Sequence, residues 1–216
     1  MRRTTRHCPD LSLYLVLDPG LCAGVGIVET ARAAVAGGAM VVQLRDKMAD
    51  TARMIETGLA LKAVLAGTGA ALIVNDDVEA AVAIGADGLH IGQGDMAVAE
   101  ARARIGAGMV LGLSVETPAL AASVDAGQVD YIGAGPVFAT LSKLDHKTPV
   151  GFEGLAAQVA ASPVPAVAIG GLKAQHVGAV LKTGARGVAV VSAICGQPDP
   201  EVAARALRQE IDALGR

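Results

Sequence analysis

Eight short apolar runs, each followed by a longer helical stretch, are the feature of this 216-residue chain that most limits its fold. The runs span Leu13–Leu17, Met40–Leu44, Ala71–Val74, Gly88–Ile91, Val110–Leu113, Tyr131–Gly133, Ala166–Ile169 and Gly187–Val191. They are apolar without alternation, which is typical of parallel strands covered on both faces. Between the runs, spacings such as Ile27, Ala31 and Ala34 place apolar residues on one helix face. We therefore expect an α/β protein, a TIM (β/α)8 barrel with a single domain over residues 1–216, in which residues 1–10 form a loose N-terminal segment.

Cap and turn residues predict where the helices begin and end. Thr117 before Pro118 and Asp77 before Val78 are typical of helix N-caps. Glycines placed where a left-handed residue would end a helix are Gly38, Gly85, Gly127 and Gly184. The short connections favour a closed barrel over an open doubly wound sheet, and no G-x-G-x-x-G motif follows the first run.

Composition narrows the range of partners. Apolar residues make up 52% of the chain and aromatic residues only 2%, so the core must be built from aliphatic side chains. A formal net charge of −3 provides no overall field that attracts nucleic acid or an anionic membrane. No run approaches the roughly 20 apolar residues of a membrane helix. The three cysteines, Cys8, Cys22 and Cys195, are far apart in sequence and predict neither a disulfide framework nor a zinc site, so we expect a cytoplasmic protein.

Polar residues follow the expected strands, at the end of the barrel where enzymes of this fold carry their sites. Arg45 and Lys47 follow the second strand and Lys143 follows the sixth, which gives the rim three cations in an acidic protein. Gln43 and Arg45 are two residues apart on an extended segment and therefore point the same way. This cluster predicts a site for a polyanion, although each cation alone is more often a solvated surface charge.

Two carboxylates at the ends of adjacent strands predict a cation site. Asp76 follows the third strand and Asp95 follows the fourth. One or two carboxylates, completed by water and substrate phosphate, are how proteins commonly hold Mg²⁺. The alternative is that both residues serve only to begin helices, which would leave their coincidence with the cations unexplained.

Small residues after the last two strands predict a separate phosphate site. Gly170-Gly171 and Val191-Ser192 occupy the loops in which barrels frequently bind phosphate through backbone N–H groups. The glycine pair could equally form only a turn, and Ser114 after strand five could be a rim hydroxyl without a chemical role. His90 is interpreted as a packed strand-end residue, because no second His or Cys lies at metal-site spacing.

Seven motifs in register resemble the thiamine phosphate synthase family, from about Tyr14 to Ile194. They are Gln-Leu-Arg-Asp-Lys, Asn-Asp-Asp, His-Ile-Gly-Gln-Gly-Asp, Gly-Leu-Ser, Gly-Pro-Val-Phe-x-Thr-x-Ser-Lys, Ile-Gly-Gly and Val-Val-Ser-Ala-Ile. The resemblance implies a transferase that uses two small phosphorylated substrates. It would displace diphosphate from hydroxymethylpyrimidine diphosphate with the ring nitrogen of a thiazole phosphate, giving thiamine phosphate.

The resemblance also implies roles for individual residues. The pyrimidine diphosphate would contact Gln43, Arg45, Lys47, Asn75, Ser114 and Lys143, of which Arg45, Ser114 and Lys143 are the candidate catalytic residues. Mg²⁺ would be held by Asp76 and Asp95. The thiazole phosphate would contact Thr140, Ser142, Gly171, Val191 and Ser192.

The loop after strand six departs from the family pattern. The family's Phe-Pro-Thr-x-Thr-Lys is replaced here by a segment with Ala139 in place of proline and Ser142 in place of threonine. The hydroxyl is retained, so phosphate binding should be too, but the loop loses a rigid residue. The segment 144–148 that follows is more charged than the resemblance leads us to expect.

Other functions stay open at this point. A related thiazole tautomerase would need a phosphate site and an acid/base but neither the cations nor the carboxylate pair. A non-catalytic protein that binds thiamine precursors would keep the same contacts without turnover. A phosphate-binding isomerase or aldolase would need a lysine that forms a Schiff base. The oligomeric state, including a homo-oligomer, is not readable from the sequence.

Overall fold

Eight parallel strands form a closed barrel in the part of the chain that the structure, a computed structural model, describes: residues 8–139 and 148–215. The strands are β1 (Leu13–Leu17), β2 (Val41–Leu44), β3 (Ala71–Asn75), β4 (Gly88–Ile91), β5 (Val110–Val115), β6 (Tyr131–Ala134), β7 (Ala166–Ala168) and β8 (Gly187–Val190). Each pairs with the next, and β8 closes the barrel by pairing with β1. The predicted (β/α)8 barrel is confirmed, with strand ends that differ from the prediction by at most two residues.

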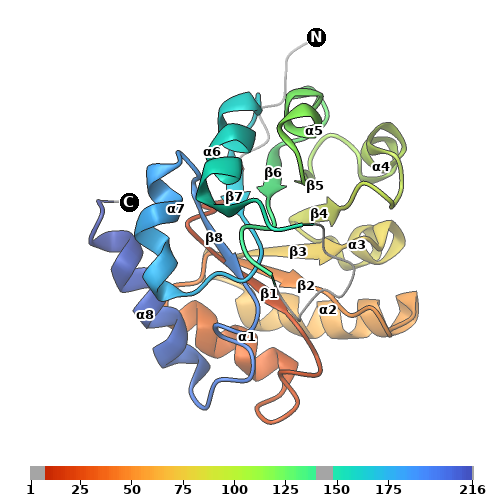
Figure 1. Ribbon diagram of the computed structural model, residues 1–216. Coiled ribbons are helices and arrows are strands. Elements are labelled where there is room, and N and C mark those ends of the chain that lie inside the picture. The colour runs from red at the N-terminus through yellow and green to blue at the C-terminus, as the bar shows by residue number, and fades with distance from the viewer. Residues whose placement is uncertain (1–7, 140–147, 216) are drawn as a thin grey trace.

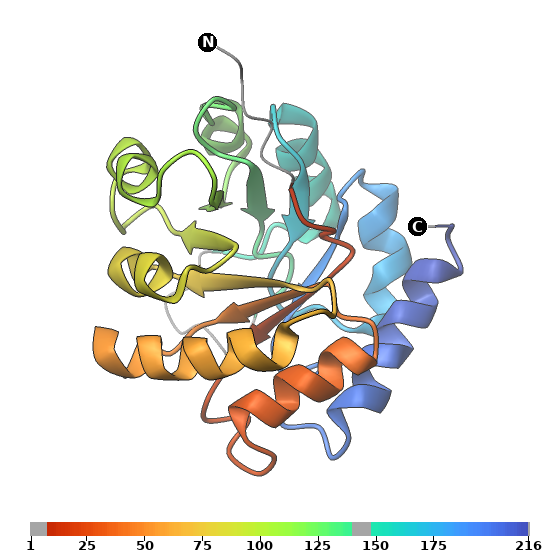
Figure 2. The ribbon, with the colours of Figure 1, turned by 180° about the vertical axis from the view of Figure 1, so that it is seen from behind.

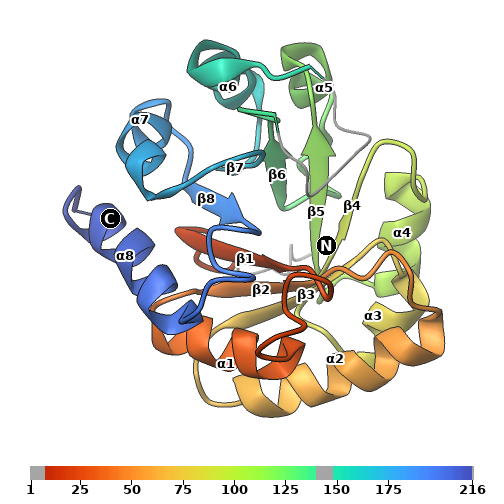
Figure 3. The same cartoon turned by 60° about the horizontal axis from the view of Figure 1, so that its bottom comes forward.

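The helices cover the outside of the barrel in chain order, as Figures 1 and 3 show. They are α1 (Ile27–Ala36), α2 (Thr51–Leu65), α3 (Val78–Ile84), α4 (Val98–Ile105), α5 (Pro118–Ala122), α6 (Gly151–Ala161), α7 (Val177–Lys182) and α8 (Pro200–Asp212), with a short 3-10 helix η1 (Ala174–His176) before α7. Seen from behind in Figure 2, α8 lies beside α1, so the last helix packs on its own barrel. Within the described ranges, no helix is long and apolar enough to cross a membrane.

Most of the predicted helix caps are confirmed. The side chain of Thr117 accepts a hydrogen bond from the backbone N–H of Leu120 at 3.1 Å, and Asp77 accepts one from Ala80 at 2.8 Å. Gly85 ends α3 in the left-handed conformation, with φ 61° and ψ 48°. Thr117 and Asp77 fix where the loops at the rim meet the helices, and Gly85 ends its helix at the opposite end of the barrel.

The prediction that Gly127 ends a helix in a left-handed conformation is wrong. Helix α5 ends at Ala122, five residues earlier, and Ser123 is its C-cap. Gly127 lies in a turn in which its N–H donates to the Asp125 carboxylate at 2.7 Å. An aspartate side chain offers the backbone this local alternative to helix, which the sequence pattern alone does not distinguish from a helix end.

The barrel has two apolar cores because alternate residues of each strand point to opposite faces. The outer core lies between strands and helices and includes Leu13, Leu15, Leu17, Val42, Leu44, Leu72, Val74, Leu89 and Ile91. The inner core fills the barrel itself and contains Leu11, Tyr14, Val41, Ile73, Val110, Tyr131, Val167 and Ala189. Gln43 is two residues after Val41 on the same strand, so its side chain also points into the barrel interior, just below the rim.

Gln158 on α6 is a buried polar residue that should reduce stability. Its side chain is fully buried, and neither amide atom has a hydrogen-bond partner among the residues that the structure describes. Because an unsatisfied buried polar group costs about 1–3 kcal/mol, Gln158→Leu is expected to raise the free energy of unfolding by about 1 kcal/mol or more. Urea denaturation checks this. The exposed Gln209→Leu on α8 is the matched control, expected to change stability by less than about 0.5 kcal/mol. A lower stability for Gln158→Leu would contradict the expectation.

Candidate active site

One cavity lies at the carboxyl ends of the strands and brings the predicted site residues together. Its volume is about 750 Å³, within the usual range for small-molecule sites. The predicted residues that line it are Gln43, Arg45, Lys47, Asn75, Asp76, Asp95, Ser114, Gly171, Val191 and Ser192. The other predicted residues, Thr140, Ser142 and Lys143, lie outside the described residues. Segments far apart in sequence therefore meet at one rim, as the fold predicts.

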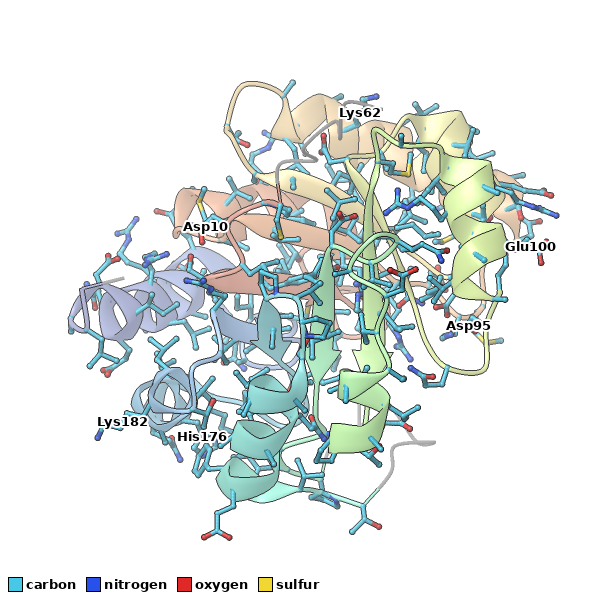
Figure 4. The ribbon with its side chains drawn as sticks, turned by 90° about the horizontal axis from the view of Figure 1, so that it is seen from above. Asp10, Lys62, Asp95, Glu100, His176 and Lys182 are labelled. Carbon is cyan, nitrogen blue, oxygen red and sulfur yellow. The ribbon has the colours of Figure 1, made fainter. Side chains whose placement is uncertain are left out.

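The two predicted carboxylates face each other across the ends of β3 and β4. Their side chains lie close enough for Asp95 to raise the pKa of Asp76, and Asp95 accepts from the Gly92 N–H at 2.7 Å. In Figure 4, Asp95 lies near α4, the helix that carries Glu100 and begins three residues after Asp95. Burial raises the pKa of Asp76, the neighbouring carboxylate of Asp95 raises it further, and the ammonium of Lys47 opposes both effects.

Asp76 is held in an uncommon backbone conformation. With φ at 61°, it is the one residue other than glycine with positive φ in the described part of the chain. Its backbone N–H donates to the His90 carbonyl at 2.9 Å, and the N–H of Asp77 donates to the Asn75 carbonyl at 2.7 Å. Asp77, not Asp76, caps helix α3, which leaves the Asp76 carboxylate available to the cavity. Such strain is often found where a side chain must be aimed at a site.

The carboxylate pair is suited to a small hard cation that takes few ligands from the protein. Among the described residues, no group of three or more His, Cys, Asp or Glu side chains could hold a metal ion. Two adjacent carboxylates, of which Asp76 is paired with Lys47, provide hard oxygen donors. This donor set fits Mg²⁺, which takes one or two protein carboxylates and completes its shell with water and phosphate oxygens.

Two cations line the same side of the cavity. Lys47 forms an ion pair with Asp76, in which the lysine side chain is 54% exposed and the aspartate side chain 23% exposed. Arg45 is partly buried and also lines the cavity. Because both follow β2, beside the carboxylates of β3 and β4, they lie where a polyanion and a divalent cation would be bound together.

A chain of buried hydrogen bonds runs through the barrel interior, and sequence reasoning missed it. Gln43 Nε2 donates to the Tyr14 hydroxyl at 2.6 Å, and the hydroxyls of Tyr14 and Tyr131 are 2.9 Å apart. The Tyr131 hydroxyl is 3.0 Å from His90 Nδ1, and His90 Nε2 is 2.9 Å from Ser114 Oγ. His90 is packed at a strand end as predicted, but it also contacts Ser114. The available signal was that both tyrosines of the chain lie inside expected strands.

The predicted phosphate loops lie on the opposite side of the cavity, after β7 and β8. Gly170 and Gly171 have φ values of 95° and 65°, which glycine adopts without strain. A Cβ atom on Gly171 would come within 2.8 Å of both the Ala139 carbonyl oxygen and Phe138 Cβ. Glycine is thus required here for close packing against the loop after β6. Val191 and Ser192 face the same space from the end of β8.

A closed β/α barrel with a carboxylate pair, cations and glycine-lined loops at one rim is typical of enzymes that act on small anionic molecules. A family model described as thiamine monophosphate synthase matches residues 13–194, and this chain belongs to that family. The chain is therefore an enzyme, a transferase.

Similar proteins cover nearly the whole chain. A thiamine-phosphate synthase of Xanthobacter autotrophicus is 51% identical over 202 residues, which cover 94% of this chain and 96% of the relative. A second, from a Psychrobacter species, is 45% identical over 210 residues, covering 96% and 98%. Among solved structures, a thiamine phosphate pyrophosphorylase from Pyrococcus furiosus matches with a TM-score of 0.86 at 36% identity, covering 95% of this chain and 97% of that one.

Proposed function

We propose that this chain, as a thiamine phosphate synthase, joins a pyrimidine diphosphate and a thiazole phosphate by a magnesium-assisted dissociative displacement. The synthase activity follows from the family and from relatives of nearly full length that carry that name. The substrates are 4-amino-2-methyl-5-hydroxymethylpyrimidine diphosphate and 4-methyl-5-(2-phosphoethyl)thiazole. The observation that carries the mechanism is that the cations, the carboxylate pair and the glycine loops line a single cavity.

The diphosphate end is assigned to the side of the cavity formed by β2, β3 and β4. Arg45 and Lys47 would bind the diphosphate oxygens, together with Asn75 and Lys143. Gln43 and Ser114 would contact the pyrimidine ring, which places Ser114 close to the reacting carbon. Charge-assisted hydrogen bonds from arginine to phosphate are among the strongest in proteins, so Arg45 should orient the diphosphate as well as bind it.

Asp76 and Asp95 would hold a Mg²⁺ ion beside the diphosphate. When bound, this ion supplies neutralisation of the charge that develops on the departing diphosphate. The two aspartates would position the ion at the end of the cavity opposite the glycine loops. Lys47, which pairs with Asp76, would also bind an incoming phosphate oxygen.

The thiazole phosphate is assigned to the loops after β6, β7 and β8. Gly171 would offer its backbone N–H to the phosphate, Ser192 would provide a hydroxyl and Val191 an apolar contact. Thr140 and Ser142 would contribute further hydroxyls. Backbone N–H groups of such loops are the usual phosphate ligands in this fold.

The chemistry then needs no nucleophile from the protein. The bond between the exocyclic methylene carbon and the diphosphate oxygen breaks, and its electron pair leaves with the diphosphate. The resulting pyrimidine-methyl cation is stabilised by its own amino group, and the thiazole nitrogen uses its lone pair to form the new C–N bond. Holding the two rings together supplies much of the acceleration. The apolar walls formed by Val16, Ile169 and Leu172 help to exclude water, which would otherwise capture the cation.

Diphosphate release tests this function. Purified protein is mixed with both substrates and Mg²⁺, and each component is omitted in turn. Release that requires all three, with an equal amount of thiamine phosphate, is expected. Binding of both substrates without release would favour a non-catalytic binder. Conversion of a thiazole carboxylate phosphate without Mg²⁺ would instead favour a tautomerase.

The setting of the enzyme is a further part of the proposal. We place it in the cytoplasm, without nucleic acid as a partner, and leave a homo-oligomer open. The support is the net charge of −3 and the three cysteines, which are free. The prediction that residues 1–10 are loose falls mainly on residues 1–7, which lie outside the described residues.

A further inference from the structure

The buried chain of hydrogen bonds connects two cavity residues, Gln43 and Ser114, through Tyr14, Tyr131 and His90. The two tyrosines are 1% and 0% exposed, and His90 is 7% exposed. The five residues come from β2, β1, β6, β4 and β5, so the chain exists only because the barrel closes. Burying a continuous polar chain in an otherwise aliphatic core carries a desolvation penalty. Hydrogen bonds between its members must offset that penalty.

The bond from Gln43 favours one direction for the rest of the chain. Gln43 Nε2 donates to the Tyr14 oxygen, so the single hydrogen of Tyr14 is available to the Tyr131 oxygen. With that start, every hydrogen of the chain is paired when Tyr131 donates to His90 Nδ1, 3.0 Å away, and His90 carries its hydrogen on Nε2 and donates to Ser114 Oγ, 2.9 Å away. In this direction the chain uses neither Gln43 Oε1, an acceptor, nor the Ser114 hydroxyl hydrogen, a donor, and both residues line the cavity.

The tyrosines keep their hydrogens at physiological pH. Burial raises the pKa of Tyr14 well above that of an ordinary phenol, and burial together with neighbouring Tyr14 does the same to the pKa of Tyr131. Both hydroxyls are therefore neutral donors.

Glycine at position 112 makes room for the centre of the chain. A Cβ atom on Gly112 would lie 2.4 Å from His90 Nδ1 and 2.3 Å from Tyr131 Cζ. Gly133, opposite, would place a Cβ atom 3.2 Å from His90 Cε1. Any larger residue at 112 would clash with the His90 and Tyr131 side chains and disrupt the hydrogen bond between them. Three polar side chains and one obligatory glycine, from four strands, therefore form one structural unit.

We propose that Tyr14, Tyr131 and His90 are positioning residues that select the 4-aminopyrimidine by fixing an acceptor at Gln43 and a donor at Ser114. The inference rests on the proposed placement of the pyrimidine beside Gln43 and Ser114. A 4-aminopyrimidine offers an amino donor next to a ring-nitrogen acceptor, whereas its 4-oxo counterpart exchanges the two. A site with fixed hydrogen-bonding direction rejects the exchanged pattern, because its buried groups are left unpaired.

Tyr131→Phe tests the proposal because it removes only the hydroxyl at the centre of the chain. Its affinity for the pyrimidine diphosphate, measured by calorimetry, is expected to fall about tenfold or more, as is kcat/KM for that substrate. The KM for the thiazole phosphate should stay within about twofold. Discrimination against the 4-oxo pyrimidine diphosphate should fall by a similar factor. Nitrogen NMR of His90 should show one Nε2–H tautomer in the unaltered protein and a mixture in the variant.

Ile73→Val is the matched control, because Ile73 lies in the same inner core and carries no polar atom. It is expected to lower thermal stability without changing the His90 tautomer or the discrimination. The double variant Tyr131→Phe/Ser114→Ala should lose less discrimination than the sum of the two single losses, since part of the effect of Tyr131 passes through Ser114. Additive losses in the double variant, or unchanged discrimination and an unchanged tautomer in Tyr131→Phe, would overturn the proposal. Failure of the synthase activity is distinguishable, because it would appear already in the unaltered protein, whereas the affinity and tautomer measurements need no turnover.

Discussion

Asp95→Asn should lower kcat at least about 100-fold, because it removes one of the two carboxylates assigned to the cation that neutralises the leaving diphosphate. The fold should persist. The asparagine oxygen can still accept the hydrogen bond that Asp95 receives from the Gly92 N–H, and the residue lies at the rim, outside both apolar cores. The measurement is diphosphate release as a function of Mg²⁺ concentration, in which the half-saturating concentration should rise together with the loss of kcat.

Glu100→Gln provides the matched control for this prediction. Glu100 is an exposed residue of α4, on the same side of the barrel as Asp95, and its loss changes the net charge equally (Figure 4). It should leave the Mg²⁺ dependence unchanged, since salt screens the charge of an exposed surface carboxylate. If the two variants showed the same Mg²⁺ dependence, the assignment of Asp95 to the cation would be wrong.

Arg45→Ala is expected to lower kcat/KM for the pyrimidine diphosphate about 100-fold, which corresponds to the loss of a charge-assisted contact to phosphate of about 2.7 kcal/mol. The KM for the thiazole phosphate should change little, because the glycine loops lie on the other side of the cavity. Steady-state kinetics with each substrate varied separately provide the measurement. Arg45→Lys should give an intermediate loss, since lysine keeps the charge but not the bidentate geometry of arginine.

Arg53→Ala is the control for the loss of positive charge. Arg53 lies on α2, pairs with Glu56 in solvent, and its side chain is 63% exposed. Such exposed pairs contribute little, so both substrates should keep their kinetic constants. An effect of Arg45→Ala on the thiazole phosphate alone would reverse the proposed assignment of the two ends of the cavity.

Local sequence was sufficient for the barrel and for most of the rim. The apolar runs, the helical spacing and caps such as Asp77 and Thr117 are set by interactions within a few residues, and the structure reproduces them. Parallel strands in a barrel all end at the same rim, so residues directly after them had to meet. This is why the sequence alone predicts one site for Arg45, Asp76 and Ser192, which line one cavity.

Local patterns were weaker where two backbone conformations are close in energy. The turn at Gly127 looked like a helix end, because the hydrogen bond from its N–H to Asp125 is as local as a helix cap. The strained φ of Asp76 had no sequence signal, since the neighbouring Asp77 is the helix cap.

The sequence by itself determined the number and order of the strands, the rim and the family, because these depend on periodicity and on motifs that are local in the chain. Only the tertiary structure decided that Tyr14 and Tyr131, 117 positions apart, would share a hydrogen bond inside the barrel. That contact depends on barrel closure and strand register, which bring β1 and β6 to opposite sides of one interior. The room that Gly112 leaves for His90 depends on the same register, and so does the link from Gln43 to Ser114.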